Sequence, residues 1–310
     1  MFLVSTANRA LFERVEKGSV VTIGAYDGMH IGHQRLLKCV VAEAARRAVP
    51  SVVMSFEPTP KEFFARANPP ARLMRFREKF DSLREAGIDV FYCPRFNAAM
   101  RDIKADTFIR RLLVQELNTR YLVIGDDFRF ATKREGNIDV LRRAGRALDF
   151  GVEQIPSVIV DGQRVSSTAI REALQQGDMD RAKRFLGRYY RMSGKVVQGK
   201  RLGRELGYPT ANVNLNRRQG AVHGIFAVRV SGIRGTAIDG VASVGTRPTF
   251  AGTYPLLEVH LFDFNEDIYG KYIHVDFIAR LRDEEKFDDA AALIEQMHRD
   301  SAAAREILAA

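Results

Sequence analysis

The sequence predicts two domains: a doubly wound α/β domain over residues 1–187 and a small antiparallel β-barrel, with a terminal helix, over residues 188–310. In the first part, short apolar segments alternate with segments of helical periodicity. From about Arg191, glycines and prolines interrupt segments of period two. The first pattern is typical of a parallel sheet covered by helices, and the second of a small barrel or sandwich.

The predicted strands of the first domain are short, apolar on both faces and bounded by Gly, Pro or Asp, as expected of buried parallel strands. They are 19–26, 51–56, 88–92, 121–125 and 152–160, with helices predicted at 33–47, 75–87 and 105–117. Right-handed crossovers then give a doubly wound sheet. Its ligand is expected beyond the carboxyl ends of the strands.

The second domain is predicted from short segments of alternating polarity separated by turn residues. These segments are 224–230, 236–244, 256–262 and 272–278. Residues 288–309 predict one or two amphipathic helices that would cover an open barrel end. No low-complexity linker separates the halves, so we expect the two domains to be closely coupled.

Composition limits the class of protein. The chain has 46% hydrophobic and 28% charged residues, within the globular range. Its two cysteines, Cys39 and Cys93, form no C-x-x-C pair, which favours a reducing, cytoplasmic compartment. Charges at Arg9 and Glu13 and the absence of a long apolar run disfavour secretion and membrane insertion. The net charge of +10 favours anionic partners without choosing among them.

A glycine-rich motif, G-x-Y-D-G-x-H-x-G-H, follows the first predicted strand. Its glycines allow a tight turn, and the helix that begins near its end offers free N–H groups to a phosphate. The two histidines would point at one phosphate chain and donate hydrogen bonds to it. The alternative is a glycine-rich turn with two surface histidines. Candidate ATP-binding residues are Gly24, Asp27 and Gly32, and candidate catalytic residues are His30 and His33.

This segment resembles the H-x-G-H signature of the Rossmann-like nucleotidyltransferase superfamily, whose members attack a nucleoside triphosphate at the α-phosphorus and release pyrophosphate. The segments 125–130 (GDDFRF) and 165–174 (VSSTAIREAL) resemble later nucleotide-binding motifs of its flavin-adenylylating branch. The resemblance implies ATP binding by Asp127, Ser166, Ser167 and Thr168, and neutralisation of pyrophosphate by Arg171. From the residues alone, the hydroxyls are equally good helix N-caps.

The segment 56–60 (FEPTP) also resembles that branch, as a loop near the flavin phosphate, which implies flavin binding at Pro58. Three residues depart from the family pattern. Tyr26 replaces a common Phe, Thr59 replaces a common His and Ala131 replaces a Gly. Loss of the ring at position 59 leaves the contribution of this loop open.

The second domain opens with a basic, glycine-rich segment, 194–212, that ends in PTAN. Such a loop would wrap phosphates, although it lacks the G-K-[ST] ending of a Walker loop. Thr210 and Asn212 present oxygen atoms on one side of an extended chain, as Mg²⁺ prefers beside ATP phosphates. The alternative is a hairpin with a Pro-Thr turn. Candidate ATP-binding residues are Gly199, Lys200, Gly203, Arg204, Thr210 and Asn212.

With PTAN, the segments 240–250, 256–271 and 281–287 resemble riboflavin kinase from end to end. Glu258 shares a strand face with His260 and Phe262. A carboxylate at the barrel mouth can accept the proton of an attacking alcohol, so Glu258 is the candidate base. The alternative is an ordinary edge-strand glutamate. The resemblance implies that Arg282, Glu284 and Phe287 lie near the flavin.

Taken together, the chain is similar to the prokaryotic bifunctional riboflavin kinase and FAD synthetase family. That implies phosphorylation of riboflavin to FMN by ATP with Mg²⁺, then adenylylation of FMN to FAD with release of pyrophosphate. No nucleic-acid or membrane partner is implied. Two alternatives stay open. One is an adenylyl- or cytidylyltransferase for another phosphate, in which the barrel only binds substrate. The other is a basic nucleic-acid-binding protein, although the barrel strands lack repeated exposed aromatics.

Overall fold

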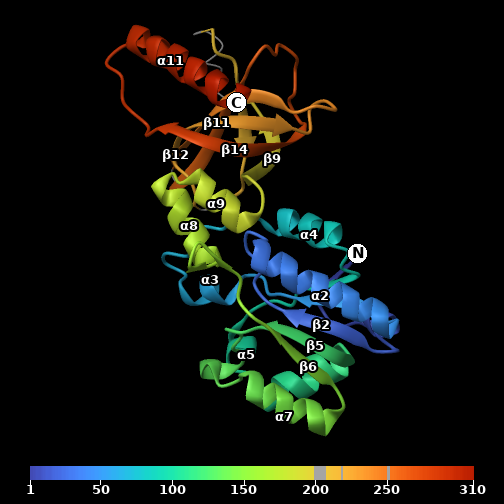
Figure 1. The fold of residues 1–310 in the computed structure, drawn as a ribbon. Coiled ribbons are helices and arrows are strands. Elements are labelled where there is room, and N and C mark those ends of the chain that lie inside the picture. The colour runs from blue at the N-terminus through green and yellow to red at the C-terminus, as the bar shows by residue number, and fades with distance from the viewer. Residues whose placement is uncertain (199–206, 218, 250–251) are drawn as a thin grey trace. The chain divides into compact units, whose positions relative to one another are not determined.

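The computed structural model describes residues 1–198, 207–217, 219–249 and 252–310. Its contacts divide the chain into two bodies, residues 1–70 with 76–165, and residues 71–75 with 166–310 (Figure 1). The predicted boundary at 187/188 stays a prediction. The candidate residues Gly199, Lys200, Gly203 and Arg204 lie outside the described residues.

The first body contains a parallel sheet of six strands in the order β1-β4-β3-β2-β5-β6. The chain adds strands outward in opposite directions from the neighbouring pair β2 and β5, which makes their junction a topological switch point. The doubly wound prediction is therefore confirmed. The strands are β1 Phe2–Val4, β2 Ser19–Ile23, β3 Ser51–Met54, β4 Val90–Tyr92, β5 Thr119–Gly125 and β6 Gly151–Ile155.

The three predicted helices of this body are confirmed, and the last begins as an α-helix and continues as a π-helix. Strand β1 and helix α1 were not predicted, because three and six residues give too little periodicity. The helices are α1 Arg9–Arg14, α2 Ile31–Arg47, α3 Pro60–Phe64, α4 Phe76–Glu85, α5 Ala98–Arg101, α6 Ala105–Thr107, the π-helix η1 Phe108–Glu116, the short 3-10 helix η2 Thr132–Arg134 and α7 Ile138–Leu148.

The single strand predicted over 152–160 is wrong. Pro156, which lacks an N–H for the ladder, follows the last residue of β6. The chain then forms a separate hairpin of β7 Ile159–Val160 with β8 Gln163–Arg164. Asp161 and Gly162 between them have φ of 51° and 73°, the positive values of a type I′ turn.

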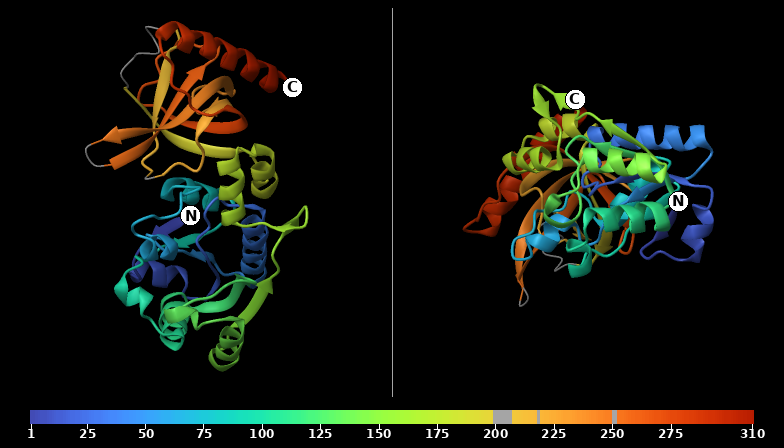
Figure 2. Two further views of the ribbon diagram at one scale, coloured as in Figure 1. Left: turned by 90° about the vertical axis from the view of Figure 1, so that its left-hand side faces the viewer. Right: turned by 90° about the horizontal axis from the view of Figure 1, so that it is seen from below.

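The second body begins with α8 Ser167–Gln176 and α9 Met179–Leu186 and continues into a closed barrel (Figure 2). The barrel order is β10-β13-β12-β11-β14-β9. The predicted barrel is confirmed and the sandwich excluded, while β9 and β10 were not predicted as strands. The strands are β9 Tyr190–Val197, β10 Thr210–Asn214, β11 Gly224–Ser231, β12 Ile238–Thr249, β13 Gly252–Leu261 and β14 Tyr272–Arg282.

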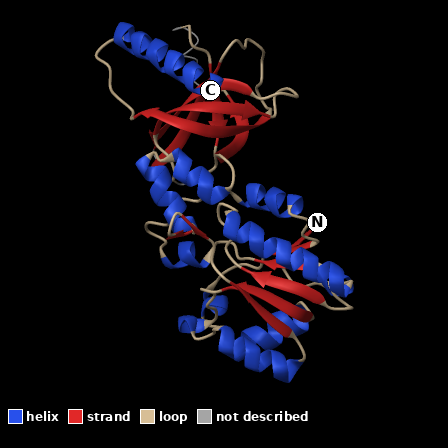
Figure 3. Ribbon diagram, viewed as in Figure 1, coloured by secondary structure: helices blue, strands red, loops and turns tan. Residues whose placement is uncertain are grey.

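The terminal segment is one helix, α11 Ala290–Ala309, which Asp289 caps by accepting a hydrogen bond from the Ala292 N–H. It lies against the barrel strands (Figure 3). Ala304 and Leu308 pack there against Ala227 and Phe262, on the outer side of the barrel. Among the described residues, no helix is long and apolar enough to cross a membrane.

Candidate active sites

The glycine-rich motif lies beyond the carboxyl end of β2, at the switch point next to β5. The loop after β5 carries Asp127, and the charges of Asp127 and Arg164 both act on His30. The sheet order therefore brings Gly24, His30 and Asp127 to one edge of the first body, as predicted for a ligand of a doubly wound domain.

The backbone of this loop passes repeatedly through left-handed conformations. Tyr26, Gly28 and Met29 have φ of 49°, 88° and 48°. Such conformations are rare for non-glycine residues and gather at functional sites. A Cβ atom at Gly24 would stand 3.0 Å from the Tyr26 ring, and one at Gly32 would stand 3.2 Å from the His30 ring. These two glycines therefore let the rings pack against the main chain.

The tyrosine that replaces the common phenylalanine has a local partner. The Tyr26 hydroxyl lies 2.7 Å from the Thr22 Oγ1, and both side chains are buried. Burial raises the pKa of Tyr26, so the phenol keeps its proton. The hydroxyl that this departure from the family pattern adds therefore has a hydrogen-bond partner on β2.

The two histidines form one stacked unit at the start of α2. His30 is its N-cap, and its Nδ1 accepts a hydrogen bond of 3.3 Å from the His33 N–H. Their ring centroids are 3.5 Å apart. Because Nδ1 of His30 accepts, its Nε2 carries the hydrogen and is the donor.

Both rings are neutral at pH 7 in the protein without ligand. Burial lowers the pKa of His30 to about 4, with Asp127 opposing and Arg164 adding to the shift. The pKa of His33 lies well below its usual value, first because of burial, and also because a protonated His30 and the charged Lys79 would repel a second positive charge. The pair is therefore suited to donate hydrogen bonds rather than to supply a full positive charge.

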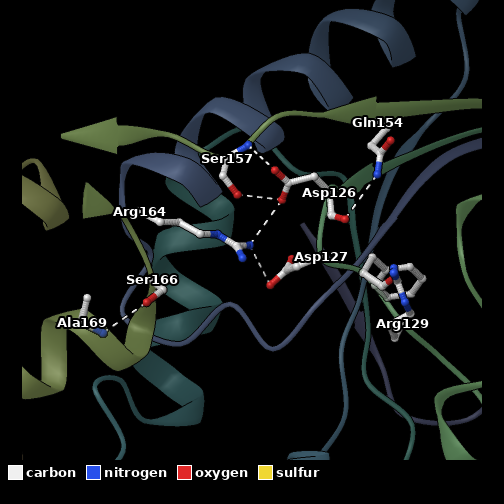
Figure 4. A network of polar contacts seen from close by, with 9 residues as sticks. Asp126, Asp127, Arg129, Gln154, Ser157, Arg164, Ser166 and Ala169 are labelled. Carbon is white, nitrogen blue, oxygen red and sulfur yellow. Dashed lines mark hydrogen bonds and ion pairs between the residues drawn. The ribbon is translucent and has the colours of Figure 1, made fainter. Parts of the chain in front are cut away.

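Arg164, which the sequence analysis did not select, pairs with Asp127 at 2.8 Å and with Asp126 at 3.3 Å (Figure 4). Asp126 also accepts hydrogen bonds from the Ser157 N–H and hydroxyl at 2.8 and 2.7 Å. Arg164 lies on β8, and the β7–β8 hairpin thereby positions its side chain beside Asp126 and Asp127. Its Asp-Gly turn was the signal that would have located the hairpin.

Lys79 was also missed. It lies on α4 with 3% of its surface exposed, and its charge acts on His33. In the sequence it falls on the apolar helix face between Phe76 and Leu83, at the helical spacings of three and four residues. A lysine at such a position is the signal that would have found it.

The loop that contains Pro58 follows β3 at the same edge of the sheet. There the Gly24 N–H donates to the Met54 carbonyl at 3.1 Å. Thr59, which replaces a common histidine, is the N-cap of α3 and forms a capping box with Glu62. Its hydroxyl and backbone N–H are thus used to start the helix. Thr59, whose contribution the sequence left open, therefore has a structural role as a helix cap.

The later motif residues lie on α8, in the second body, and are described by their own contacts. Ser166 caps the helix by accepting from the Ala169 N–H at 3.1 Å (Figure 4). Arg171 donates to the carbonyls of Ala71 and Ser167 at 2.6 and 3.1 Å. Ser167 is half-buried and Thr168 is exposed. The N-cap alternative therefore holds for Ser166.

The barrel places three candidate residues, Thr210, Asn212 and Glu258, on one face of two neighbouring strands, together with His260. In the β10–β13 ladder, Asn212 pairs with Glu258 and Thr210 with His260. Leu257 and Val259 are fully buried, so the alternating residues, including Glu258, face outward in this closed barrel. The sequence predicts Glu258 at the barrel mouth, whereas the alternation of β13 places it on the outer wall.

The predicted flavin-contacting segment begins at the end of β14. Arg282 binds Asp300 of α11 through two nitrogens, at 2.9 and 2.8 Å, and the Asp300 side chain is only 8% exposed. The Arg282 guanidinium also lies 5.7 Å from the Phe287 ring centroid. The charge of Arg282 is therefore engaged in holding α11 on the barrel.

Glu284 lies beside the strand that neighbours Glu258. Its Oε1 is 3.5 Å from the Ser243 hydroxyl, and Ser243 pairs with Glu258 in the β12–β13 ladder. A Cβ at Gly245 would collide with the Glu284 carboxylate, so this glycine makes room for it. The structure therefore places Glu258 and Glu284 near the same strand residue.

Oxygen donors on the outer barrel face fit Mg²⁺. Thr210, Asn212 and Glu258 share that face, and Asn212 is largely buried. Mg²⁺ commonly takes one or two protein oxygens and completes its shell with phosphates and water. Among the described residues, no group of three His, Cys, Asp or Glu side chains is arranged to hold a metal ion.

Comparison with known sequence families divides the chain in two. Residues 12–169 match the sequence model of a family described as FAD synthetase, and residues 186–308 match that of riboflavin kinase. The first match covers the motif loops of the parallel sheet, and the second covers the barrel and α11.

Three curated bacterial relatives carry the name bifunctional riboflavin kinase/FMN adenylyltransferase. The protein of Haemophilus influenzae is 43% identical over 93% of this chain and 93% of its own length. That of Escherichia coli is 43% identical over 96% and 95%. That of Pseudomonas fluorescens is 44% identical over 94% of each.

A solved structure described as a macrolide-efflux protein from Streptococcus pneumoniae has the same fold. It is 29% identical to this chain, with a TM-score of 0.82, and the match covers 98% of this chain and 99% of that one. The efflux description belongs to that protein.

Proposed function

This chain belongs to the bifunctional riboflavin kinase/FMN adenylyltransferase family, and on that premise we propose which residues carry out each of its two reactions. The chain phosphorylates riboflavin to FMN with ATP and adenylylates FMN to FAD with a second ATP. A barrel that only binds substrate is excluded, because residues 186–308 match riboflavin kinase.

Phosphorylation is proposed to take place on the outer barrel face. Glu258 accepts the proton of the terminal ribityl hydroxyl. The hydroxyl oxygen bonds to the γ-phosphorus of ATP, and ADP leaves. The observation that carries this assignment is the pairing of Glu258 with Asn212 across the ladder. Arg282, Glu284 and Phe287 are proposed to lie along the flavin, with Glu284 beside Ser243.

The PTAN segment is proposed to hold Mg²⁺ through the oxygens of Thr210 and Asn212, which share the face of Glu258. Bound there, Mg²⁺ would neutralise charge on the ATP phosphates. Gly199, Lys200, Gly203 and Arg204 are proposed to cover those phosphates, from the motif resemblance alone.

Adenylylation is proposed to take place at the switch point of the parallel sheet. The FMN phosphate attacks the α-phosphorus of ATP, and pyrophosphate leaves. This nucleophile is already anionic at pH 7, since the second pKa of a phosphate monoester is about 6, so no general base is required. His30 and His33 donate hydrogen bonds to the charge that develops on the α-phosphate.

Other residues are proposed to bind the substrates of this reaction. Gly24, Asp27 and Gly32 approach the nucleotide from the β2 loop, and Pro58 lies near the flavin phosphate. Asp127 is paired with Arg164, and its charge acts on His30. On α8, Ser166, Ser167, Thr168 and Arg171 are proposed to bind the triphosphate and the leaving pyrophosphate.

The cellular setting is proposed to be the cytoplasm, without a nucleic-acid or membrane partner. Cys39 and Cys93 are both free thiols, as expected in a reducing compartment. The net charge of +10 would then attract the phosphate groups of nucleotides and flavins.

The test is a crossed assay of two variants by chromatography. With riboflavin, ATP and Mg²⁺, Glu258→Gln is expected to form FMN about 10³-fold more slowly, yet to convert added FMN to FAD at the wild-type rate. The double variant His30→Ala/His33→Ala is expected to do the opposite and accumulate FMN, with adenylylation lowered about 10²-fold or more.

Matched controls lie outside both sites. Glu306→Gln on α11 and His223→Ala before β11 change the same residue types at exposed positions and should leave both rates unchanged. Equal loss of both activities in Glu258→Gln would remove Glu258 as the base. Normal FAD formation by the double histidine variant would remove the histidines from the adenylylation site.

A further inference from the structure

A second concave site lies in the first body, at the amino ends of the strands. It is a hollow of about 690 Å³. Its lining residues lie where β2, β5 and β6 begin and near the ends of α2 and α7, elements that are labelled in Figure 1. The motif loops follow the carboxyl ends of β2 and β5, so the hollow lies at the opposite edge of the same sheet. Its lining is Lys17, Arg47, Val49, Arg120, Arg142, Gly145, Arg146, Asp149, Phe150, Gly151 and Val152.

The hollow is strongly cationic. Five basic side chains line it against one carboxylate, that of Asp149. Arg47 is paired with Glu43 at 2.6 Å. Within the described ranges, the other four basic residues form no ion pair, and neither does Asp149. Those four are Lys17, Arg120, Arg142 and Arg146.

Compensation of helix dipoles does not account for this charge. The carboxyl ends of α2 and α7 each carry about half a negative charge, so together they call for about one cation. The four unpaired cations are opposed by about one negative charge from the two helix ends and by one from Asp149. A net charge of about +2 therefore remains in the hollow. Such a charge matches a diphosphate or triphosphate group.

Packing against neighbouring residues helps to position two of the arginines. Arg120 lies over Gly18, where a Cβ atom would stand 2.4 Å from its Cγ. Gly151 accommodates the Tyr121 ring in the same way, and Arg47 lies 4.5 Å above the centroid of that ring. Arg120, which has packing contacts but no carboxylate partner among the residues that the structure describes, keeps its N–H groups available for phosphate oxygens, which a guanidinium binds in pairs.

We propose that this hollow is a second anion site, specific for a small polyphosphate such as pyrophosphate or the triphosphate of a nucleotide. Its volume lies within the range of about 300–1,000 Å³ usual for small-molecule pockets. Nucleic acid would need cations spread along many successive phosphates, whereas these four converge on one place. The site is independent of the residues assigned to either reaction.

Hydrogen exchange of the full-length protein tests the proposal. Inorganic tripolyphosphate is expected to slow exchange at 145–152 and 47–49, whereas sulfate at equal ionic strength is not. Arg142→Ala/Arg146→Ala should raise the concentration needed for this protection at least tenfold. Arg143→Ala should not, because Arg143 lies on the same helix but does not line the hollow. Lys17→Ala/Arg120→Ala removes cations from the strand side and should act like the first variant.

Parallel titrations with pyrophosphate and ATP separate the possible sources of the anion. Protection by both points to the phosphate chain alone, and protection by ATP at lower concentration points to a nucleotide. Three results would overturn the proposal: protection confined to residues 24–33, protection that survives both double variants, or protection by a short RNA without any by tripolyphosphate.

Discussion

The two proposed active sites are built by different means. At the switch point of the parallel sheet, loops pass through left-handed conformations at Tyr26, Gly28 and Met29 and hold two neutral histidines in a stack. On the barrel, the candidate residues occupy regular ladder positions, with Asn212 opposite Glu258. The first site depends on burial and backbone strain, and the second on strand register.

The difference lies in what each site must do. Loops beyond parallel strands converge on one point from several elements, so they can surround a phosphate chain. The hydrogen bonds of a β-ladder fix which side chains lie opposite one another and how far apart they are. Such fixed spacing suits a catalytic base beside metal-binding oxygens. We therefore expect perturbations of strain and protonation to act on the first body and perturbations of packing to act on the second.

The largest expected effect tests the packing of the barrel. Asp300→Ala leaves Arg282 largely buried without its partner and should lower the free energy of unfolding of the barrel by about 3 kcal/mol. Urea-dependent hydrogen exchange in β11 and β14 measures this. The control, Asp263→Ala, breaks an exposed pair with Arg305 on the same helix and should lower it by less than 1 kcal/mol. Equal losses would mean that Arg282–Asp300 does not hold α11.

The second effect is a pH dependence confined to the first body. The unfolded chain protonates His30 near pH 6.5, whereas burial lowers its pKa to about 4 in the fold. The stability from the neutral ring is therefore complete above pH 6.5 and is lost as the pH falls toward 4. Between pH 7 and 4.5 the loss should be about 2.5 kcal/mol.

His30→Asn keeps a side chain that can cap α2 but cannot titrate. Its first body should therefore lose about 2.5 kcal/mol less than the wild type over this pH interval, measured by urea-dependent exchange in β2 and β5. An identical acid profile for both proteins would show that His30 is not the group responsible.

A third, smaller effect should be stabilising. Ala131, which replaces a glycine of the family pattern, has φ of 65° and ψ of −177°, a region that is essentially restricted to glycine. Ala131→Gly should raise the free energy of unfolding of the first body by about 1 kcal/mol. Relief of backbone strain outweighs the greater conformational entropy that a glycine loses on folding. Ala147→Gly, within α7, should lower it by a similar amount. The same sign for both would exclude strain at Ala131.

The smallest effect concerns the hydroxyl of Tyr26. Tyr26→Phe leaves the buried Thr22 hydroxyl without this partner and should lower the free energy of unfolding by roughly 0.5–1 kcal/mol. Adenylylation should change little, because the ring against His33 is kept. Tyr269→Phe, at an exposed position on the barrel, should have no measurable effect. A stability gain in Tyr26→Phe would contradict the role of this hydrogen bond.

Sequence periodicity and short motifs determined the local features of this protein. They predicted the strand and helix alternation, the barrel, the glycine-rich loop with His30 and His33, and the helix start at Ser166. Each of these depends on residues within a few positions of one another, so the chain itself carries the information. The same signals failed at β1 and α1, which are too short, and at the strand that Pro156 divides.

The tertiary structure alone decided which distant residues meet. It brought Arg164 to Asp127, Lys79 to His33 and Asp300 to Arg282, and it gathered four unpaired cations at the far edge of the sheet. These contacts follow from the order and register of strands. Because pairing between strands joins residues far apart in the chain, periodicity along one segment does not specify its partner.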